Sequence, residues 1–117
     1  MPLLIEAHRY LVEQLAGRIN EMVFGADGTI ATSEDGGAGR PLTIVTPTIR
    51  VIDEHTLSAE GIIPSSTTLI LPIKEVCLQY RSPTDSTDIT PIFRYTFDPI
   101  TKDSTNELKF SVLVEVK

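Results

Sequence analysis

The chain has 117 residues, of which 41% are hydrophobic and 22% charged, which is enough apolar material for one domain with a single core. Its formal charge of −6 argues against nucleic acid and acidic membrane surfaces as partners, because both require a basic patch. The single cysteine excludes an internal disulfide, and no apolar run approaches the roughly 20 residues that span a bilayer. We therefore expect a soluble domain with neither nucleic acid nor a membrane as partner.

Residues 1–24 show the periodicity of an amphipathic helix. Apolar residues recur at spacings of three and four along one stripe: Leu4, Leu11, Val12, Leu15, Ile19, Met22 and Val23. His8 falls on or beside this stripe, and Gly17 indicates either close packing or a helix end near it. The stripe leaves two interpretations open, namely packing onto the domain's own sheet and docking onto a neighbouring subunit. We expect it to dock as much as to pack, so that a chain without residues 1–20 stays folded.

Residues 25–41 predict a long loop, because they hold five of the seven glycines and one large aliphatic side chain, Ile30. Connections of this length are uncommon inside compact domains and are usually functional or disordered. The glycine spacing does not match a phosphate-binding loop, and the acidic residues lack the alternation of a helix-loop-helix calcium site. We expect this loop to be mobile in the free protein and ordered against a partner, through Asp27, Glu34 and Arg40.

Residues 42–117 predict the strands of the domain. Residues 42–52 are rich in β-branched side chains, and Pro47 indicates an edge strand or a break within them. Residues 53–55 then form a turn, and residues 57–63 pair back as a hairpin.

Residues 69–81 are the apolar centre of the chain. Their apolar side chains occupy odd positions up to Ile73 and even positions from Val76 onward. Successive strand side chains point to opposite faces, so this change of phase requires a bulge or bend between two strand segments. The alternative is one strand buried on both faces, for which the phase does not matter.

Two more strands follow. Residues 93–97 alternate aromatic with polar side chains. The last strand places five apolar residues on one face, namely Leu108, Phe110, Val112, Val114 and Val116. Short strands separated by Gly, Pro and Ser turns predict a mainly β fold, an antiparallel β-sandwich with one N-terminal amphipathic α-helix.

No pattern in the sequence indicates catalysis. Cys77 lies between two apolar residues of a predicted strand, which favours a buried, inert thiol over a nucleophile. His8 and His55 have no cysteine partner at metal-ligand spacing. The acidic pairs lie in predicted turns, where no feature separates their pKa values as acid-base chemistry requires. We expect no enzyme, no metal and no cofactor.

The order and composition of the segments after residue 24 resemble small virion proteins of tailed bacteriophages, particularly tail, fibre and baseplate proteins built on short β-domains. The resemblance is carried by the Gly25-Ala26-Asp27-Gly28-Thr29 loop, the threonine-rich strand 43–49, the aromatic strand 93–97 and the alternating strand 108–116. It implies an assembly role without catalysis, and no functional residue of the family maps onto a matching position here.

We therefore expect a structural subunit of a phage tail, baseplate or fibre attachment, made in the host cytoplasm and located in the virion. It would contact other virion proteins and form a homo-oligomer, with a trimer favoured by the resemblance. The alternatives are a capsid decoration or cement protein and a soluble module that binds a peptide or glycan. The predicted partner-binding residues are Leu4, His8, Leu11, Leu15, Met22, Asp27, Glu34 and Arg40.

Overall fold

A helix and two antiparallel sheets make up the molecule. The computed structural model describes residues 4–32 and 34–116. In these residues the elements are α1 (Ile5–Arg18), β1 (Glu21–Gly25), β2 (Pro41–Val45), β3 (Thr48–Val51), β4 (Thr56–Ile63), β5 (Ile73–Arg81), β6 (Ile89–Ile100) and β7 (Leu108–Glu115). The predicted mainly β fold with one N-terminal helix is confirmed.

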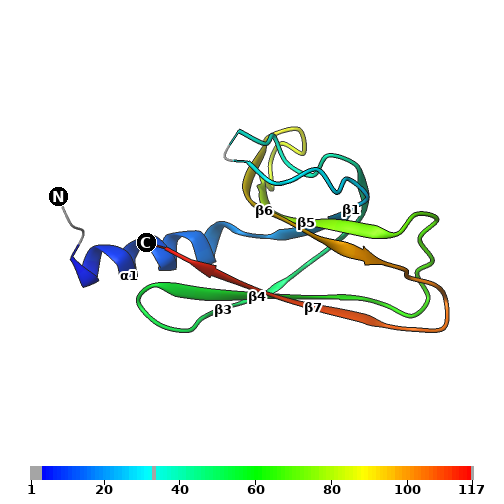
Figure 1. Cartoon of the computed structure of the whole chain (residues 1–117). Coiled ribbons are helices and arrows are strands. Elements are labelled where there is room, and N and C mark those ends of the chain that lie inside the picture. The colour runs from blue at the N-terminus through cyan, green and yellow to red at the C-terminus, as the bar shows by residue number, and fades with distance from the viewer. Residues whose placement is uncertain (1–3, 33, 117) are drawn as a thin grey trace.

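The strands form two layers. One sheet has the order β2-β1-β5-β6 and the other β3-β4-β7, and all paired strands are antiparallel. Figure 1 shows the two sheets stacked on one another, with α1 extending past one end of the stack. The core between them is largely aliphatic and includes Met22, Phe24, Leu57, Ile63, Ile73, Val76, Leu78, Val112 and Val114. The antiparallel β-sandwich predicted from the sequence is therefore the observed architecture.

The helix is shorter than the predicted 1–24. It ends at Arg18, one residue after Gly17, and the next apolar residues form β1. β1 is an inner strand that pairs with both β2 and β5, and Met22 within it is fully buried. A short apolar run fits the period of a helix as well as that of a strand. The residues of β1 form a strand because they pair with a neighbouring strand on each side.

β5 shows both features considered for residues 69–81, a pairing irregularity and burial on both faces. Its pairing with β6 has a register shift between Ile73 and Glu75, the irregularity that the change of phase requires. The prediction of strand segments at residues 69–73 and 76–80 is wrong for the first segment, because the strand begins only at Ile73 and Ile70 before it is 97% exposed. Every residue from Glu75 to Gln79 is buried, so this strand is covered on both faces.

Pro47 marks the point where the chain crosses from one sheet to the other. β2 is at the edge of the first sheet and β3 at the edge of the second, so the proline breaks the predicted strand between two edge strands. The predicted hairpin is confirmed, because β3 pairs with β4 from Thr48↔Glu60 to Val51↔Leu57. Its turn is closed by the Asp53 carboxylate, which accepts a hydrogen bond from the backbone N–H of His55 at 2.8 Å.

Lys102 fixes the approach to β5. Its side chain is buried, and its ammonium group donates hydrogen bonds to the carbonyl oxygens of Thr67, at 2.5 Å, and of Asp103. The backbone N–H of Leu69 in turn donates to the Lys102 carbonyl at 3.2 Å. These bonds join the segment before β5 to the segment after β6.

The loop between β1 and β2 lies on the side of the first sheet that faces away from the second sheet (Figure 1). The Glu75 side chain on β5 is fully buried beneath it. Its carboxylate accepts hydrogen bonds from the backbone N–H groups of Asp27 (2.7 Å), Gly39 (2.7 Å) and Arg40 (3.0 Å). The Nε of Arg94 on β6 donates to the same carboxylate at 2.9 Å.

Arg94 holds the same loop by donating hydrogen bonds, whereas Glu75 accepts them. The Arg94 side chain is only 6% exposed and reaches acceptor groups of the loop. It donates to the carbonyl oxygens of Asp27 and Thr29, both at 3.0 Å, and to the Asp35 carboxylate at 2.9 Å. Glycine is needed at Gly25, because a Cβ there would run into the Glu75 carboxylate. The sequence predicts a mobile loop, because the loop has few apolar side chains. In the structure this polar network holds the loop to the sheet instead.

The network also sets the charge state of its carboxylates. Burial raises the pKa of Glu75, but hydrogen bonds from Arg94 and from the backbone of Arg40, Gly39 and Asp27 outweigh it and lower that pKa overall. The backbone N–H of Thr32, followed by the Arg94 guanidinium, lowers the pKa of Asp35. A carboxyl group with a lowered pKa stabilises the fold above its unfolded-state pKa and loses that contribution as pH falls through its folded-state pKa.

We expect Glu75→Ala to lower the free energy of unfolding by about 3 kcal/mol, because it leaves Nε of the buried Arg94 and three loop N–H groups without their acceptor. Urea unfolding followed by circular dichroism measures this change. Glu60→Ala is the matched control, since it removes an exposed ion pair with Lys109 that is worth at most about 1 kcal/mol. Equal losses in the two variants would contradict the role assigned to Glu75.

We also expect the wild-type protein to lose stability as the pH falls below the ordinary range of carboxyl groups, about 4, where Glu75 and Asp35 become protonated. Glu75→Gln should flatten this dependence, because its amide does not titrate. Thermal melting between neutral and acid pH checks both statements, and parallel curves for the two proteins would refute them.

Candidate partner-binding surface

The second half of α1 belongs to the core. Val12 is fully buried, Leu15 packs against the core, and Ile19, just beyond the helix, is 5% exposed. The side chain of Asn20 then forms two hydrogen bonds of 2.9 Å with the backbone of Arg81 on β5. The expectation that the sandwich closes its core without residues 1–20 is therefore wrong, because those residues supply part of that core.

The first half of α1 extends past the end of the sandwich (Figure 1). It exposes four large apolar side chains, which we name the helix tip: Leu4 (76% exposed), Ile5 (55%), Tyr10 (62%) and Leu11 (39%). Leu4 and Leu11 are seven residues apart and share one side of the helix, the side that continues the buried stripe. The helix tip is thus an apolar surface on an element whose other half is fixed in the core.

Two histidines join the helix to the domain. The rings of His8 on α1 and His55 in the β3–β4 turn meet edge to face, with centroids 4.6 Å apart. Nδ1 of His8 is buried and has no hydrogen-bond partner among the described residues. Within residues 4–32 and 34–116, no three His, Cys, Asp or Glu side chains are grouped to hold a metal ion. The contact of the two rings packs α1 against the β3–β4 turn.

The predicted helix residues fall into three environments. Leu4 and Leu11 are exposed at the helix tip. His8 and Leu15 are partly buried between α1 and the sandwich. Met22 is fully buried in an inner strand, so its assignment to a partner surface is wrong. Ile5 and Tyr10 are exposed as well, although the apolar stripe does not predict them as contact residues, and Tyr10 lies off that stripe.

The predicted loop residues lie over the first sheet, away from the helix tip (Figure 1). Asp27 is used within the loop, because its carboxylate accepts a hydrogen bond from the backbone N–H of Thr29 at 2.9 Å. The Thr29 side chain first, and that backbone N–H second, lower the pKa of Asp27. Arg40 holds the loop to Glu75 through its backbone, and Glu34 is exposed. The structure therefore does not unite the eight predicted residues into one site.

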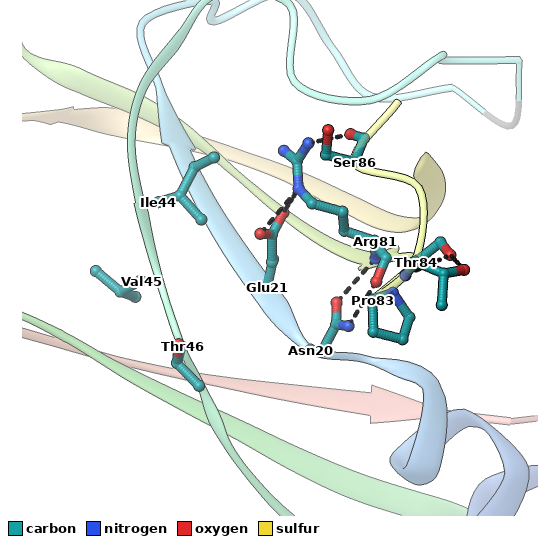
Figure 2. Close-up of a pocket in the computed structure, with 10 residues that line it drawn as sticks. Asn20, Glu21, Ile44, Val45, Thr46, Arg81, Pro83, Thr84 and Ser86 are labelled. Atoms are coloured by element: carbon teal, nitrogen blue, oxygen red, sulfur yellow. Dashed lines mark hydrogen bonds and ion pairs between the residues drawn. The ribbon is translucent and has the colours of Figure 1, made fainter. Parts of the chain in front are cut away.

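One cavity, of about 570 Å³, lies beside the junction of α1 and β1 (Figure 2). Its lining residues are Asn20, Glu21, Ile44, Val45, Thr46, Arg81, Ser82, Pro83, Thr84 and Ser86. The two charged side chains that line it form an ion pair, in which Nε of Arg81 is 3.0 Å from both carboxylate oxygens of Glu21. Gln79 donates to the same carboxylate at 2.7 Å. The Glu21 carboxylate in this cavity is thus held by two side chains of β5.

An apolar groove runs along the opposite side of the sandwich, where the edges of β6 and β7 face each other. It has a volume of about 450 Å³ and is lined by Val76, Tyr95, Phe97, Asp98, Pro99, Ile100, Phe110, Ser111 and Val112. Phe97 and Phe110 meet across it, with ring centroids 5.4 Å apart. We name it the β6–β7 groove.

Cys77 is fully buried in β5, as predicted. Burial raises the pKa of its thiol to about 11, so the group stays protonated at neutral pH. The thiol therefore lacks the thiolate character that a nucleophile needs.

No protein-family model matches the chain, and no curated protein sequence matches it either. Across residues 4–32 and 34–116 the structure has no helix that combines the length and apolarity needed to cross a bilayer. The surface described above must therefore be interpreted from its own residues.

The two halves of α1 should respond differently to the same substitution. Val12→Asp places a carboxylate in the core and should lower the free energy of unfolding by several kcal/mol, about 3 or more. Leu4→Asp, at a side chain that is 76% exposed, should change it by less than about 0.5 kcal/mol. Urea unfolding separates the two, and a strongly destabilised Leu4→Asp variant would show that the helix tip is not a free surface.

Proposed function

We propose that this protein is a non-catalytic structural subunit of a tailed bacteriophage, located in the virion after synthesis in the host cytoplasm. Its place would be the tail, the baseplate or a fibre attachment, where it contacts other virion proteins. The observation that carries the proposal is the helix tip, an apolar surface on a helix fixed at its other end in the core.

The helix tip has the properties of a docking element. Exposed apolar side chains gain roughly 25 cal/mol for each Å² that a partner removes from water. Helices of this kind bind by laying side chains at spacings of three, four and seven into a groove of the partner. Val12 and Ile19 hold the helix to the domain, so little conformational freedom is lost on binding.

The chemistry of the described residues supports a structural role. Glu21 and Arg81 are the charged residues that line the cavity in Figure 2, and they are paired with each other. The chain's single thiol, that of Cys77, is buried. The buried ion pair of Glu75 and Arg94 is used to hold a loop. Each of these polar groups thus has a structural partner already, and the apolar helix tip is the feature that calls for another protein.

The proposal is tested with phage particles that carry variants of this chain. Leu4→Asp combined with Ile5→Asp should abolish incorporation into tails, because burying a carboxylate in an apolar contact is costly, while the melting temperature stays unchanged. Ile70→Asp is the control, since Ile70 is an apolar residue 97% exposed on a different segment, and it should be incorporated normally. Immunoblots of purified tails and heads provide the measurement.

Three outcomes would contradict the proposal. Recovery of the wild-type chain with heads instead of tails would favour a capsid decoration protein. Recovery with neither would favour a soluble binding module. Normal incorporation of the double variant would show that the helix tip is not the docking element.

A further inference from the structure

In the part of the chain that the structure describes, the sandwich has four edge strands, which are β2 and β6 in the first sheet and β3 and β7 in the second. An edge strand exposes unpaired N–H and C=O groups, and proteins protect such edges with prolines, bulges or short strands. β2 begins at Pro41, beside a register shift, and β3 has only four residues. β6 contains Pro91 and Pro99 and has two register shifts. Three of the four edges are therefore protected.

β7 has none of these devices. Its eight residues contain no proline, and they pair with β4 without a register shift from Thr56↔Glu115 to Ile63↔Leu108. Leu113 on its outward face is 68% exposed. Its free edge borders the β6–β7 groove, where Tyr95 is 56% exposed. An open hydrogen-bonding edge and an apolar groove thus lie side by side.

The sequence of β7 is complementary to itself when it runs antiparallel to a second copy with Val112 opposite Val112. In that register Lys109 of each copy faces Glu115 of the other, so two opposite-charge pairs form. On the inner face Phe110 lies opposite Val114, which pairs apolar with apolar. Opposite charges and apolar partners are the cross-strand pairs that stabilise antiparallel strands.

Neighbouring registers lose this match. A shift of two residues in one direction places Glu107 opposite Glu115, and the opposite shift places Glu115 opposite Ser111. A shift of one residue brings inner-face side chains opposite outer-face ones, which the buried face does not allow.

We propose that this chain forms a homodimer in which the β7 strands of two copies pair antiparallel about a two-fold axis at Val112. The second sheets of the two copies then join into one six-stranded sheet, and each copy covers the β6–β7 groove of the other. Pro91 and Pro99 prevent the β6 edges from pairing in the same way, because proline has no N–H to donate. A two-fold contact of this kind is closed, so the unit in solution is a dimer in place of the trimer implied by the resemblance.

Charge exchange at the two positions tests the proposal. Lys109→Glu places like charges opposite each other twice in the dimer, and Glu115→Lys does the same with the opposite sign. Each single variant should raise the dimer dissociation constant by about tenfold, and the double variant should restore it close to the wild-type value. Light scattering after size-exclusion chromatography over a concentration series measures the constants, with circular dichroism to verify that each variant is folded.

Two controls separate this contact from general charge effects. Glu13→Lys changes the net charge as Glu115→Lys does, but on the exposed side of α1, and should leave the dimer unaffected. Lys109→Glu also removes the exposed ion pair of Lys109 with Glu60, at 3.3 Å, whereas Glu115→Lys does not. Agreement between the two single variants therefore assigns the effect to the contact between copies.

Hydrogen exchange shows which strand forms the contact between the two copies. Amides of β7 should exchange more slowly in the dimer than at dilutions where the protein is monomeric, while those of the β3 edge should not change. A protein that stays monomeric at all concentrations, a trimer, or a double variant as weak as the single ones would each overturn the proposal.

Discussion

The buried ion pair between Glu75 and Arg94 is the interaction that holds the loop between β1 and β2 on the first sheet, and the structure of that layer depends on it. Taking both charges out of water is costly, and the cost is offset only because each group also satisfies backbone groups of the loop between β1 and β2. Glu75 accepts from loop N–H groups and Arg94 donates to loop carbonyl oxygens, so one pair holds a segment almost without apolar side chains. Removal of Glu75 would leave Nε of Arg94 and three loop N–H groups without an acceptor, and removal of Arg94 would leave the buried Glu75 carboxylate without its cation.

The same pair explains why β5 can be the centre of the sheet. One of its faces packs into the core through Val76 and Leu78, while the other carries Glu75 and Cys77 under the loop, and Gln79, whose side chain donates to Glu21. A strand with a buried polar face needs partners supplied from elsewhere in the chain. The loop that the sequence marks as glycine-rich provides them, because its backbone approaches β5 closely at Gly25.

The molecule presents two different kinds of surface for association. The helix tip offers side chains alone, on a helix fixed by Val12, and suits a groove on another protein. The free edge of β7 offers backbone groups together with apolar side chains, and suits a strand. The two surfaces use different residues, so self-association through β7 and docking through the helix tip are compatible. On the other side of the sandwich, the chain crosses between the sheets at Pro47, and both strands there are protected edges.

The sequence by itself determined the elements whose pattern is local. The alternation of β7, the β3–β4 hairpin, the break at Pro47 and the mainly β class follow from side-chain period and turn chemistry, which act over a few residues. Only the tertiary structure decided the rest. The residues of β1 fit a helical stripe as well as a strand until β2 and β5 flank them. The apolar stripe also does not show which of its side chains the core takes, so Met22 and Leu15 look the same in sequence as Leu4 and Leu11. Glu75 between apolar neighbours was a signal of a buried charge, but its partners lie 19 to 48 residues away in sequence, and distances of that kind are set by packing and not by local pattern.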